Sequence, residues 1–142
     1  MEQPRIVIDT NVLVAALRSK RGASYKLLNI INSEKFSIHI SVPLVLEYED
    51  VAKRLLEDIP LTEQDVDDIL DYLCAVAQRH QIFYLWRPFL KDPKDDMVLE
   101  LAVTANCDFI VTYNKRDFQG AERFGLRVVT SKEFLEEIGE LP

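Results

Sequence analysis

Cysteine and histidine are scarce in this sequence of 142 residues, and their scarcity excludes several kinds of site. The two cysteines, Cys74 and Cys107, are far apart, and the only histidines are His39 and His80. No Cys-x-x-Cys motif or adjacent Cys/His pair is present, so we do not expect a structural zinc site. We expect two buried free thiols, which suit the reducing cytosol.

Glycine is equally scarce, and the glycine-dependent phosphate-binding motifs are missing. The four glycines, Gly22, Gly120, Gly125 and Gly139, form no Gly-x-Gly-x-x-Gly motif, no P-loop and no Gly-x-Ser-x-Gly elbow. These absences disfavour a dinucleotide site, a P-loop nucleotidase and a serine hydrolase. No signal-peptide pattern opens the sequence and no window approaches 18 apolar residues, so we expect a cytoplasmic protein without a membrane segment.

Acidic residues outnumber basic ones, and the net charge is −7. Proteins that bind nucleic acid mainly by neutralising phosphates are usually basic, so a simple DNA-binding module is disfavoured. A nuclease that uses metal ions remains compatible with this charge, because the ions invert the local potential. An acidic patch can also recruit a basic partner protein. The length predicts one domain, residues 1–142.

Short apolar strands alternate with helices along the chain, which predicts an α/β fold with a parallel sheet covered on both faces. The predicted strands are Arg5–Ile8, Ser37–Ile40, Ile82–Leu85, Phe109–Thr112 and Arg127–Val129. The predicted helices are Asn11–Leu17, Ser24–Asn32 with Ser24 as its cap, Pro43–Glu57, Thr62–Arg79 with Thr62 as its cap and His80 at its end, Asp95–Asn106, and a last helix from Ser131.

Acidic and amide side chains follow two of these strands. Asp9-Thr10-Asn11 comes after the first strand, and Asn114 and Asp117 come after Phe109–Thr112. The helix that leads into that second strand begins with Asp92-Pro93-Lys94-Asp95-Asp96. Sites in such folds form beyond the carboxyl ends of the strands, so these groups converge if the two strands are neighbours.

Helical winding selects among the remaining acids. Glu47 lies about 60° from Leu44, on the border of the apolar face of its helix, where a carboxylate must be paired or bound to metal. Asp95 is aligned with the apolar stripe of Leu99 and Ala102, Asp96 lies about 100° away at its margin, and Glu100 falls on the polar side.

Each acid also has a purely structural interpretation. Asp9 can cap the helix that follows it, Asp95 and Asp96 can complement a helix dipole, and Asp117 can be a turn residue. Glu47 can pair with a cation such as an arginine. The coincidence of three acidic groups at one sheet edge favours a site for a hard cation, Mg²⁺ or Mn²⁺.

Polar and basic neighbours of this edge leave the same choice open. Asn11, Thr112 and Asn114 can position a carboxylate or a water, or can be turn, cap and strand-end residues. Lys115 and Arg116 flank the proposed site and can contact phosphates, or can belong to a solvated loop. A basic cluster in the first loop, Arg18, Lys20 and Arg21, has the same two interpretations.

Four segments together resemble the motifs of the PIN-domain family, in the order that the family has them. They are Ile6–Val12, Pro43–Tyr48, Asp92–Ala102 and Val111–Phe118. The resemblance spans nearly the whole chain, and it implies a three-layer α/β/α sandwich with a central parallel sheet. It also implies Mg²⁺- or Mn²⁺-dependent cleavage of single-stranded RNA, with Asp9, Glu47, Asp95 and Asp117 as ligands.

The sequence is most similar to prokaryotic PIN proteins that act as toxins, which implies a cognate antitoxin that blocks the site and a homodimer. One position departs from the family pattern, because many members have an acid where Asn114 stands. This departure predicts weaker metal binding, or a single ion without substrate. The alternative is a PIN-fold module that binds RNA or a partner without cutting. A phosphatase is disfavoured, because Asp9-Thr10-Asn11 lacks the second acid of an Asp-x-Asp motif.

Overall fold

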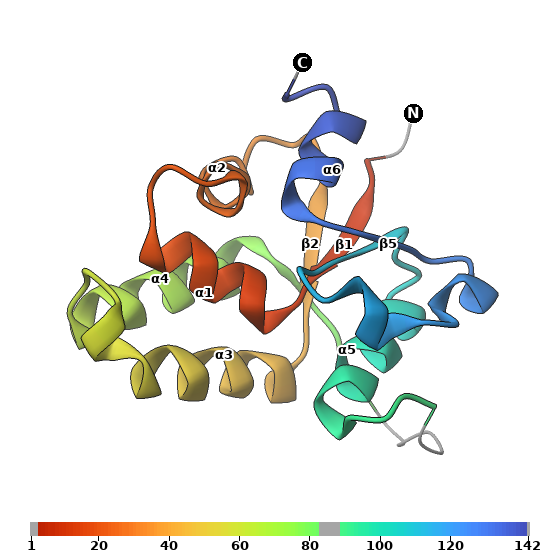
Figure 1. Cartoon of the computed structure of the whole chain (residues 1–142), viewed down its shortest axis with the longest axis horizontal. Helices are drawn as coiled ribbons and strands as arrows, with labels where there is room; N and C mark the ends of the chain where they lie inside the picture. Colours follow the sequence, from red (N-terminus) through yellow and green to blue (C-terminus); the bar gives the residue numbers. More distant parts are fainter. Residues whose placement is uncertain (1–2, 83–88, 142) are drawn as a thin grey trace.

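Strands and helices alternate along the chain in the computed structural model, which describes residues 3–82 and 89–141 (Figure 1). The strands are β1 (Arg5–Ile8), β2 (Ser37–Ile40), β3 (Gln78–Arg79), β4 (Phe109–Val111) and β5 (Arg127–Val129). The α-helices are α1 (Thr10–Arg18), α2 (Ala23–Asn29), α3 (Val42–Arg54), α4 (Glu63–Val76), α5 (Pro93–Thr104) and α6 (Ser131–Glu137). Three short 3₁₀ helices are η1 (Leu56–Asp58), η2 (Lys115–Phe118) and η3 (Ala121–Phe124).

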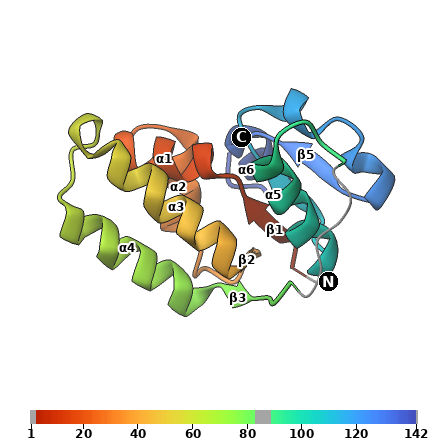
Figure 2. The same cartoon turned by 90° about the horizontal axis from the view of Figure 1, so that it is seen from below.

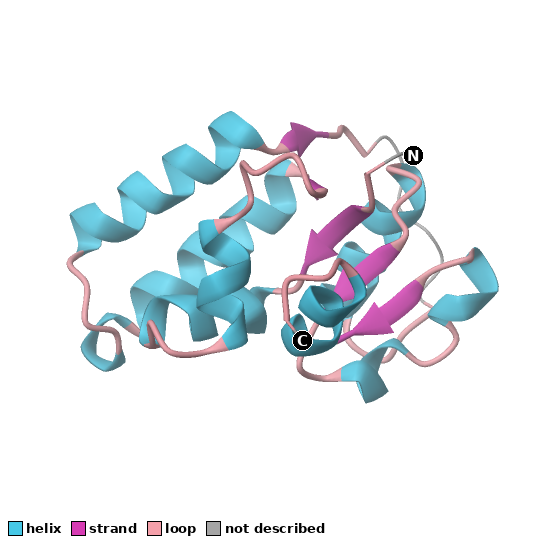
Figure 3. Ribbon diagram, turned by 90° about the horizontal axis from the view of Figure 1, so that it is seen from above, coloured by secondary structure: helices cyan, strands magenta, loops and turns pink. Residues whose placement is uncertain are grey.

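All pairings in the sheet are parallel, and the strand order is β3-β2-β1-β4-β5 (Figure 3). β1 and β4 are direct neighbours, with Ile6 opposite Phe109 and Ile8 opposite Val111. The predicted parallel α/β fold is therefore confirmed. The neighbouring position of these two strands also meets the condition under which the acids that follow them converge.

The two faces of the sheet have different coverings. On one face, Ile8 and Ile38 share a small apolar space with side chains of α1, α2, α3 and α4. On the other face, α5 contacts β1, β2 and β4, and the guanidinium of Arg5 donates to the carbonyl of Ala105 at the end of α5. Helix α5 therefore lies across the strands whose carboxyl ends carry the acids.

Helices α3 and α4 lie side by side on their face of the sheet (Figure 2). Ser41 caps α3 by accepting a hydrogen bond from the backbone of Leu44, and Pro43 stands in its first turn as predicted. Thr62 forms a capping box with Asp65 at the start of α4, which confirms the predicted cap. Lys53 of α3 then reaches Asp67 of α4 at 2.9 Å.

Several local predictions were wrong because tertiary contacts decide them. Ser24 does not cap α2, whose cap position is Gly22; Ser24 lies buried inside the helix. Helix α4 ends at Val76 rather than Arg79, because Gln78 and Arg79 pair with β2 as strand β3, and His80 follows that strand. Of the predicted strand Ile82–Leu85, Ile82 is in no strand and the rest lies outside the described residues.

Helix α5 is buried on more sides than the sequence pattern suggests. Glu100, predicted on the polar side, is only 6% exposed, and Leu101 beside it is fully buried. The reason is that α5 packs against α3 and η2 as well as against the sheet. Both cysteines are free, but Cys74 is only partly buried, and Cys107 lies between α5 and β4 rather than in a helix.

Among the described residues, no helix has both the length and the apolar character needed to cross a lipid bilayer.

Candidate active site

Asp9 stands directly after β1, at the carboxyl end of the sheet, and its side chain is held by its neighbours. One carboxylate oxygen accepts a 2.8 Å hydrogen bond from the backbone of Thr10, and the other accepts a 2.8 Å bond from the hydroxyl of Thr112. The backbone N–H of Asp9 donates to the carbonyl of Val111 on β4. Asp9 therefore caps α1, as its structural interpretation predicted, and is also fixed against the neighbouring strand.

The environment of Asp9 favours its protonated form. Burial is the main cause that raises its pKa, since the residue is only 9% exposed. The negative charges of Asp117 and Asp92 raise the pKa further, while the hydrogen bonds from Thr112 and Thr10 lower it. A cation beside Asp9 would reverse this balance.

Asp95, in the first turn of α5, is affected more strongly. Burial raises its pKa from the ordinary value of 3.8 to about 7, and neighbouring carboxylates add to the effect. Those carboxylates are, in decreasing order of influence, Asp9, Asp92, Asp117 and Asp96. The structure thus brings Asp95 close enough to Asp9 and Asp117 for their charges to repel.

Asp96 has a different environment from Asp95. One of its carboxylate oxygens accepts backbone hydrogen bonds from Phe89 at 3.2 Å and from Leu90 at 2.8 Å. These donors belong to the loop before α5, so Asp96, which stands in the first turn of α5 as predicted, also anchors that loop. Its carboxylate is engaged there and acts on Asp95 only as the weakest of the neighbouring charges.

Glu47 lies on α3 and is paired with a cation. Its carboxylate is 3.4 Å from the ammonium of Lys94, and the Glu47 side chain is 16% exposed. The predicted position at the border of the apolar face agrees with this burial. The partner is a lysine of α5, not an arginine, and it connects α3 with the helix that carries Asp95. Glu47 is not among the charges that raise the pKa of Asp9 or Asp95.

A hydrogen-bond network surrounds the buried hydroxyl of Thr112, at the end of β4. This hydroxyl donates to Asp9 and accepts from the backbone of Asn114 at 3.0 Å and from the side-chain amide of Asn11 at 3.4 Å. The side-chain carbonyl of Asn11 accepts from the backbone of Tyr113 at 3.3 Å. Thr112 and Asn11 therefore hold the loop after β4 against Asp9.

The residues further along that loop are exposed. Asp117 lies in η2, and its negative charge reaches both Asp9 and Asp95. The ammonium of Lys115 is 2.9 Å from Glu133 of α6 and is thus engaged in an ion pair. Arg116 is exposed to solvent. Lys115 is thus shared between α6 and the site edge.

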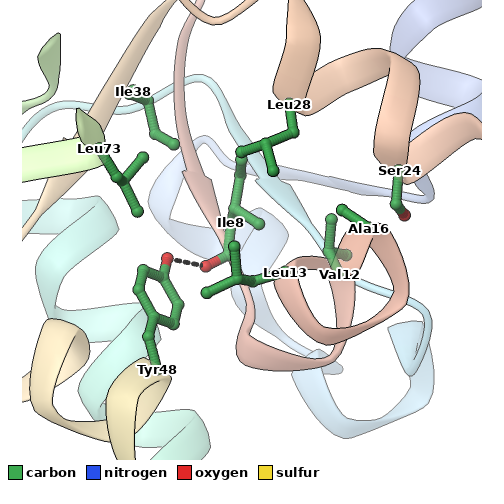
Figure 4. Close-up of a pocket in the computed structure, with 9 residues that line it drawn as sticks. All are labelled: Ile8, Val12, Leu13, Ala16, Ser24, Leu28, Ile38, Tyr48 and Leu73. Atoms are coloured by element: carbon green, nitrogen blue, oxygen red, sulfur yellow. Dashed lines mark hydrogen bonds between the residues drawn. The ribbon is translucent and has the colours of Figure 1, made fainter. Parts of the chain in front are cut away.

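Tyr48, next to Glu47 on α3, fixes the helix to the end of β1. Its hydroxyl donates to the carbonyl of Ile8, the residue before Asp9 (Figure 4). Burial raises the pKa of Tyr48 well above its ordinary value, so the hydroxyl stays a donor. The adjoining space lined by Leu13, Ile38 and Leu73 has a volume of about 10 Å³, which is room for one water and no ligand.

An open groove of about 670 Å³ lies between α1 and α3, beside the acids. Polar side chains at one end of its lining are those of Thr10, Asn11, Glu47 and Tyr113. Its other lining residues are Val14, Ala15, Arg18, Ser19, Val51 and Leu55. The groove is large enough for part of an extended polymer, and its lining includes Thr10, the residue after Asp9.

The donors at this edge match a hard divalent cation, because they are carboxylates that repel one another when no cation is near. Within residues 3–82 and 89–141, however, no three histidine, cysteine, aspartate or glutamate side chains are arranged to hold one ion. This is compatible with Mg²⁺, which usually takes only one or two protein carboxylates and completes its shell with water and phosphate oxygens.

Sequence reasoning did not select Asp92 as a site residue or Tyr113 as a feature of the site. Asp92 caps α5 through the backbone of Lys94, and its charge raises the pKa of both Asp9 and Asp95. The run Asp92-Pro93-Lys94-Asp95-Asp96 was the available signal for Asp92. No local signal existed for Tyr113, because its partners come from distant segments.

The sequence matches a known protein family, and the fold matches solved structures. The family model of the PIN domain matches residues 5–116. No curated protein matches the sequence significantly.

Two solved structures share the fold at low sequence identity. A structure of VapBC2 from Rickettsia felis, bound to a DNA fragment from their promoter, has 15% identity and a TM-score of 0.56, covering 87% of this chain and 96% of that one. A structure of VapBC-1 from nontypeable Haemophilus influenzae has 14% identity and a TM-score of 0.60, covering 90% of this chain and 98% of that one.

Proposed function

Because the chain belongs to the PIN-domain family, we propose that it is an endoribonuclease that hydrolyses single-stranded RNA with Mg²⁺ or Mn²⁺. The observation that carries the proposal is the pair of Asp9 and Asp95. These two carboxylates extend from the end of β1 and from α5 toward the same edge; burial and neighbouring carboxylates raise the pKa of each, and Asp9 is the strongest of those neighbours for Asp95. Such a pair is suited to bind a cation, because a positive charge would relieve the repulsion between carboxylates.

Each acid has its own part in this proposal. Asp9 is the most rigid ligand, since Thr10 and Thr112 hold both of its oxygens. Asp95 supplies the second carboxylate, Asp117 approaches from the η2 side, and Glu47 joins when it separates from Lys94. A bound divalent ion lowers the pKa of water and neutralises charge on the phosphodiester, which is the chemistry that the protein groups lack.

Lys94 is suited to exchange its present partner, Glu47, for a phosphate oxygen of the substrate. It neutralises Glu47 in this structure, and its side chain is 60% exposed. Once released from Glu47, which would help to hold a divalent cation, the ammonium of Lys94 would be available for a phosphate oxygen. Lys94 is then a candidate phosphate contact beside Lys115, which is paired with Glu133.

We also propose that the protein is the toxin of a toxin–antitoxin pair. Two solved structures of similar fold are structures of VapBC proteins. The net charge of −7 suits a partner that carries basic residues. An adjacent small gene that encodes a basic protein would support the existence of such an antitoxin. A homodimer is a further expectation from the family resemblance.

A second candidate function is a PIN-fold module that binds RNA or a partner without cutting it. Two observations favour it: Asn114 stands where many family members have an acid, and the described residues hold no ready-made ligand group for one ion. The two candidates differ in a single measurable property, which is metal-dependent cleavage.

The experiment is to incubate the purified protein with a mixed pool of single-stranded RNA in Mg²⁺, in Mn²⁺ and in EDTA. We expect cleavage with either metal and none in EDTA. Asp9→Asn should abolish the cleavage, whereas Asp68→Asn, an exposed aspartate of α4, should leave it unchanged. RNA binding without cleavage by the folded wild type would favour the second candidate, and cleavage that resists EDTA would exclude the metal mechanism.

A further inference from the structure

Tyr113 is an exposed aromatic residue at the edge of the acidic site. It directly follows Thr112, the residue that holds Asp9, and it is 46% exposed. It lines the groove between α1 and α3 together with Asn11 and Glu47. Its ring therefore lies where a ligand in the groove can reach it.

The ring of Tyr113 is fixed at both ends. Its hydroxyl shares a 2.5 Å hydrogen bond with the hydroxyl of Ser24, which in turn shares a 2.8 Å bond with Ser131. Ser24 on α2 and Ser131 on α6 are both buried. Because the backbone N–H of Tyr113 donates to Asn11, the residue is held from its main chain to its hydroxyl. The ring is therefore held in one position.

The groove has the charge distribution that a nucleic acid strand requires. Glu47 and Thr10, the residue after Asp9, line the part of the groove where a divalent cation would receive the scissile phosphate, and Arg18 lines the groove farther along α1. Among the described residues that line this groove, Tyr113 is the only aromatic one. A strand whose phosphate lies at the acids and whose neighbouring phosphate meets Arg18 would bring a base to Tyr113.

We propose that Tyr113 is a platform on which a base of single-stranded RNA stacks, next to the phosphate that is cut. Stacking between a base and an aromatic ring tolerates any base, because every base has a π-face. A ring that is already immobilised loses little conformational entropy when the base binds. The inference rests on the proposed function and names the part of the substrate that the groove holds.

The test separates the ring from its hydroxyl. Fluorescence anisotropy would measure the affinity for labelled single-stranded RNA in a slow-cleaving Asp95→Asn background with Mg²⁺. A parallel set of RNAs would carry one abasic position each. We expect Tyr113→Leu to weaken binding by about tenfold and to remove the sensitivity to one abasic position. Tyr113→Phe should keep most of the affinity, and Tyr72→Leu, at an exposed tyrosine of α4, should keep all of it.

Ser24→Ala provides a second, independent variant. It releases the hydroxyl of Tyr113 but keeps the ring, so we expect a smaller loss of affinity than with Tyr113→Leu. Melting curves of every variant would confirm that the fold is intact. Unchanged affinity of a folded Tyr113→Leu variant, or equal sensitivity to all abasic positions before and after the substitution, would overturn the inference.

The outcomes also distinguish this inference from the proposed function. Metal-dependent cleavage by the wild type together with normal RNA binding by Tyr113→Leu would overturn the inference alone, and would leave the groove to a protein partner. If Tyr113→Leu weakens RNA binding and removes the sensitivity to one abasic position, but the wild type never cuts RNA, the inference is supported and the nuclease proposal fails. No RNA binding and no cleavage by the wild type, together with no RNA binding by the Asp95→Asn parent, would overturn both.

Discussion

Asp95 and Asp96 are adjacent in the sequence, but their carboxylates have different partners. Asp95 is repelled by Asp9 and Asp117, whereas Asp96 accepts hydrogen bonds from the backbone of Phe89 and Leu90. Helical winding alone separated the two, because Asp95 heads the apolar stripe that must face the sheet. It could not identify the bonds of Asp96, since they depend on the path of the preceding loop.

We predict that Asp95→Asn lowers RNA cleavage by about 100-fold or more, a larger loss than removal of an outer partner of a metal ligand causes. Asp96→Asn should change cleavage only modestly, because its amide oxygen can still accept the bonds from the loop. Single-turnover cleavage of one labelled RNA by both variants would measure this. An inactive Asp96→Asn protein beside an active Asp95→Asn protein would reverse the assignment.

The raised pKa of Asp95 predicts a pH dependence of stability in the metal-free protein. Between about pH 4 and 7 the folded protein keeps a proton on Asp95 that the unfolded chain releases. The free energy of unfolding therefore falls through this group as the pH rises across that range, and stays low above it. Asp95→Asn removes the effect, so the stability of the variant relative to wild type should grow from pH 4 to pH 7.

The comparison with a variant is necessary because two histidines act in the opposite direction. Burial lowers the pKa of His39 to about 4 and also lowers that of His80, so both favour folding as the pH rises. Urea unfolding in EDTA at several pH values would give the difference between wild type and Asp95→Asn. A difference that does not change with pH would show that the environment of Asp95 has been misjudged, and Asp96→Asn provides the matched control.

At the scale of elements, a hydrogen bond from α3 to the end of β1 holds the two elements together beside Asp9. Tyr48 donates its hydroxyl to the carbonyl of Ile8, next to Asp9. Tyr48→Phe keeps the ring but leaves a buried carbonyl with one partner fewer, so we predict a loss of about 1–3 kcal/mol in the free energy of unfolding. Urea unfolding with an unchanged m-value would measure it.

The exposed Tyr72 of α4 supplies the control for that substitution. Tyr72→Phe should alter the free energy of unfolding by less than about 0.5 kcal/mol, as is usual for surface changes. Equal effects of the two substitutions would mean that the hydrogen bond to Ile8 contributes nothing to stability.

Elements with a strong local signal were predictable from the sequence, and those decided by distant contacts were not. β1, β2 and β5 have the predicted bounds, because short apolar runs between polar turns identify buried parallel strands. The end of α4 was missed because Gln78 pairs with His39 across the sheet, a contact between segments about 40 residues apart in sequence. The role of Ser24 depends on Tyr113 and Ser131, which come much later in the chain.

At the scale of the whole molecule, the parallel topology brings acids from distant parts of the sequence to one candidate site. The order β3-β2-β1-β4-β5 places the ends of β1 and β4 together, and α5 returns Asp95 to the same edge. The sequence pattern anticipated this edge because strand ends in such folds are the usual place for sites. It could not anticipate the ion pair of Glu47 with Lys94, which requires the packing of α3 beside α5.

The central claim is that these carboxylates form a site for a divalent metal ion, and binding of Mn²⁺ measured by electron paramagnetic resonance tests it most directly. The account predicts saturable binding of one or two ions by the wild type. Asp9→Asn should weaken that binding by about 100-fold or more while its melting curve shows an intact fold. Asp68→Asn should bind Mn²⁺ as the wild type does. Equal binding by wild type and Asp9→Asn, or no saturable binding by the wild type, would contradict the account.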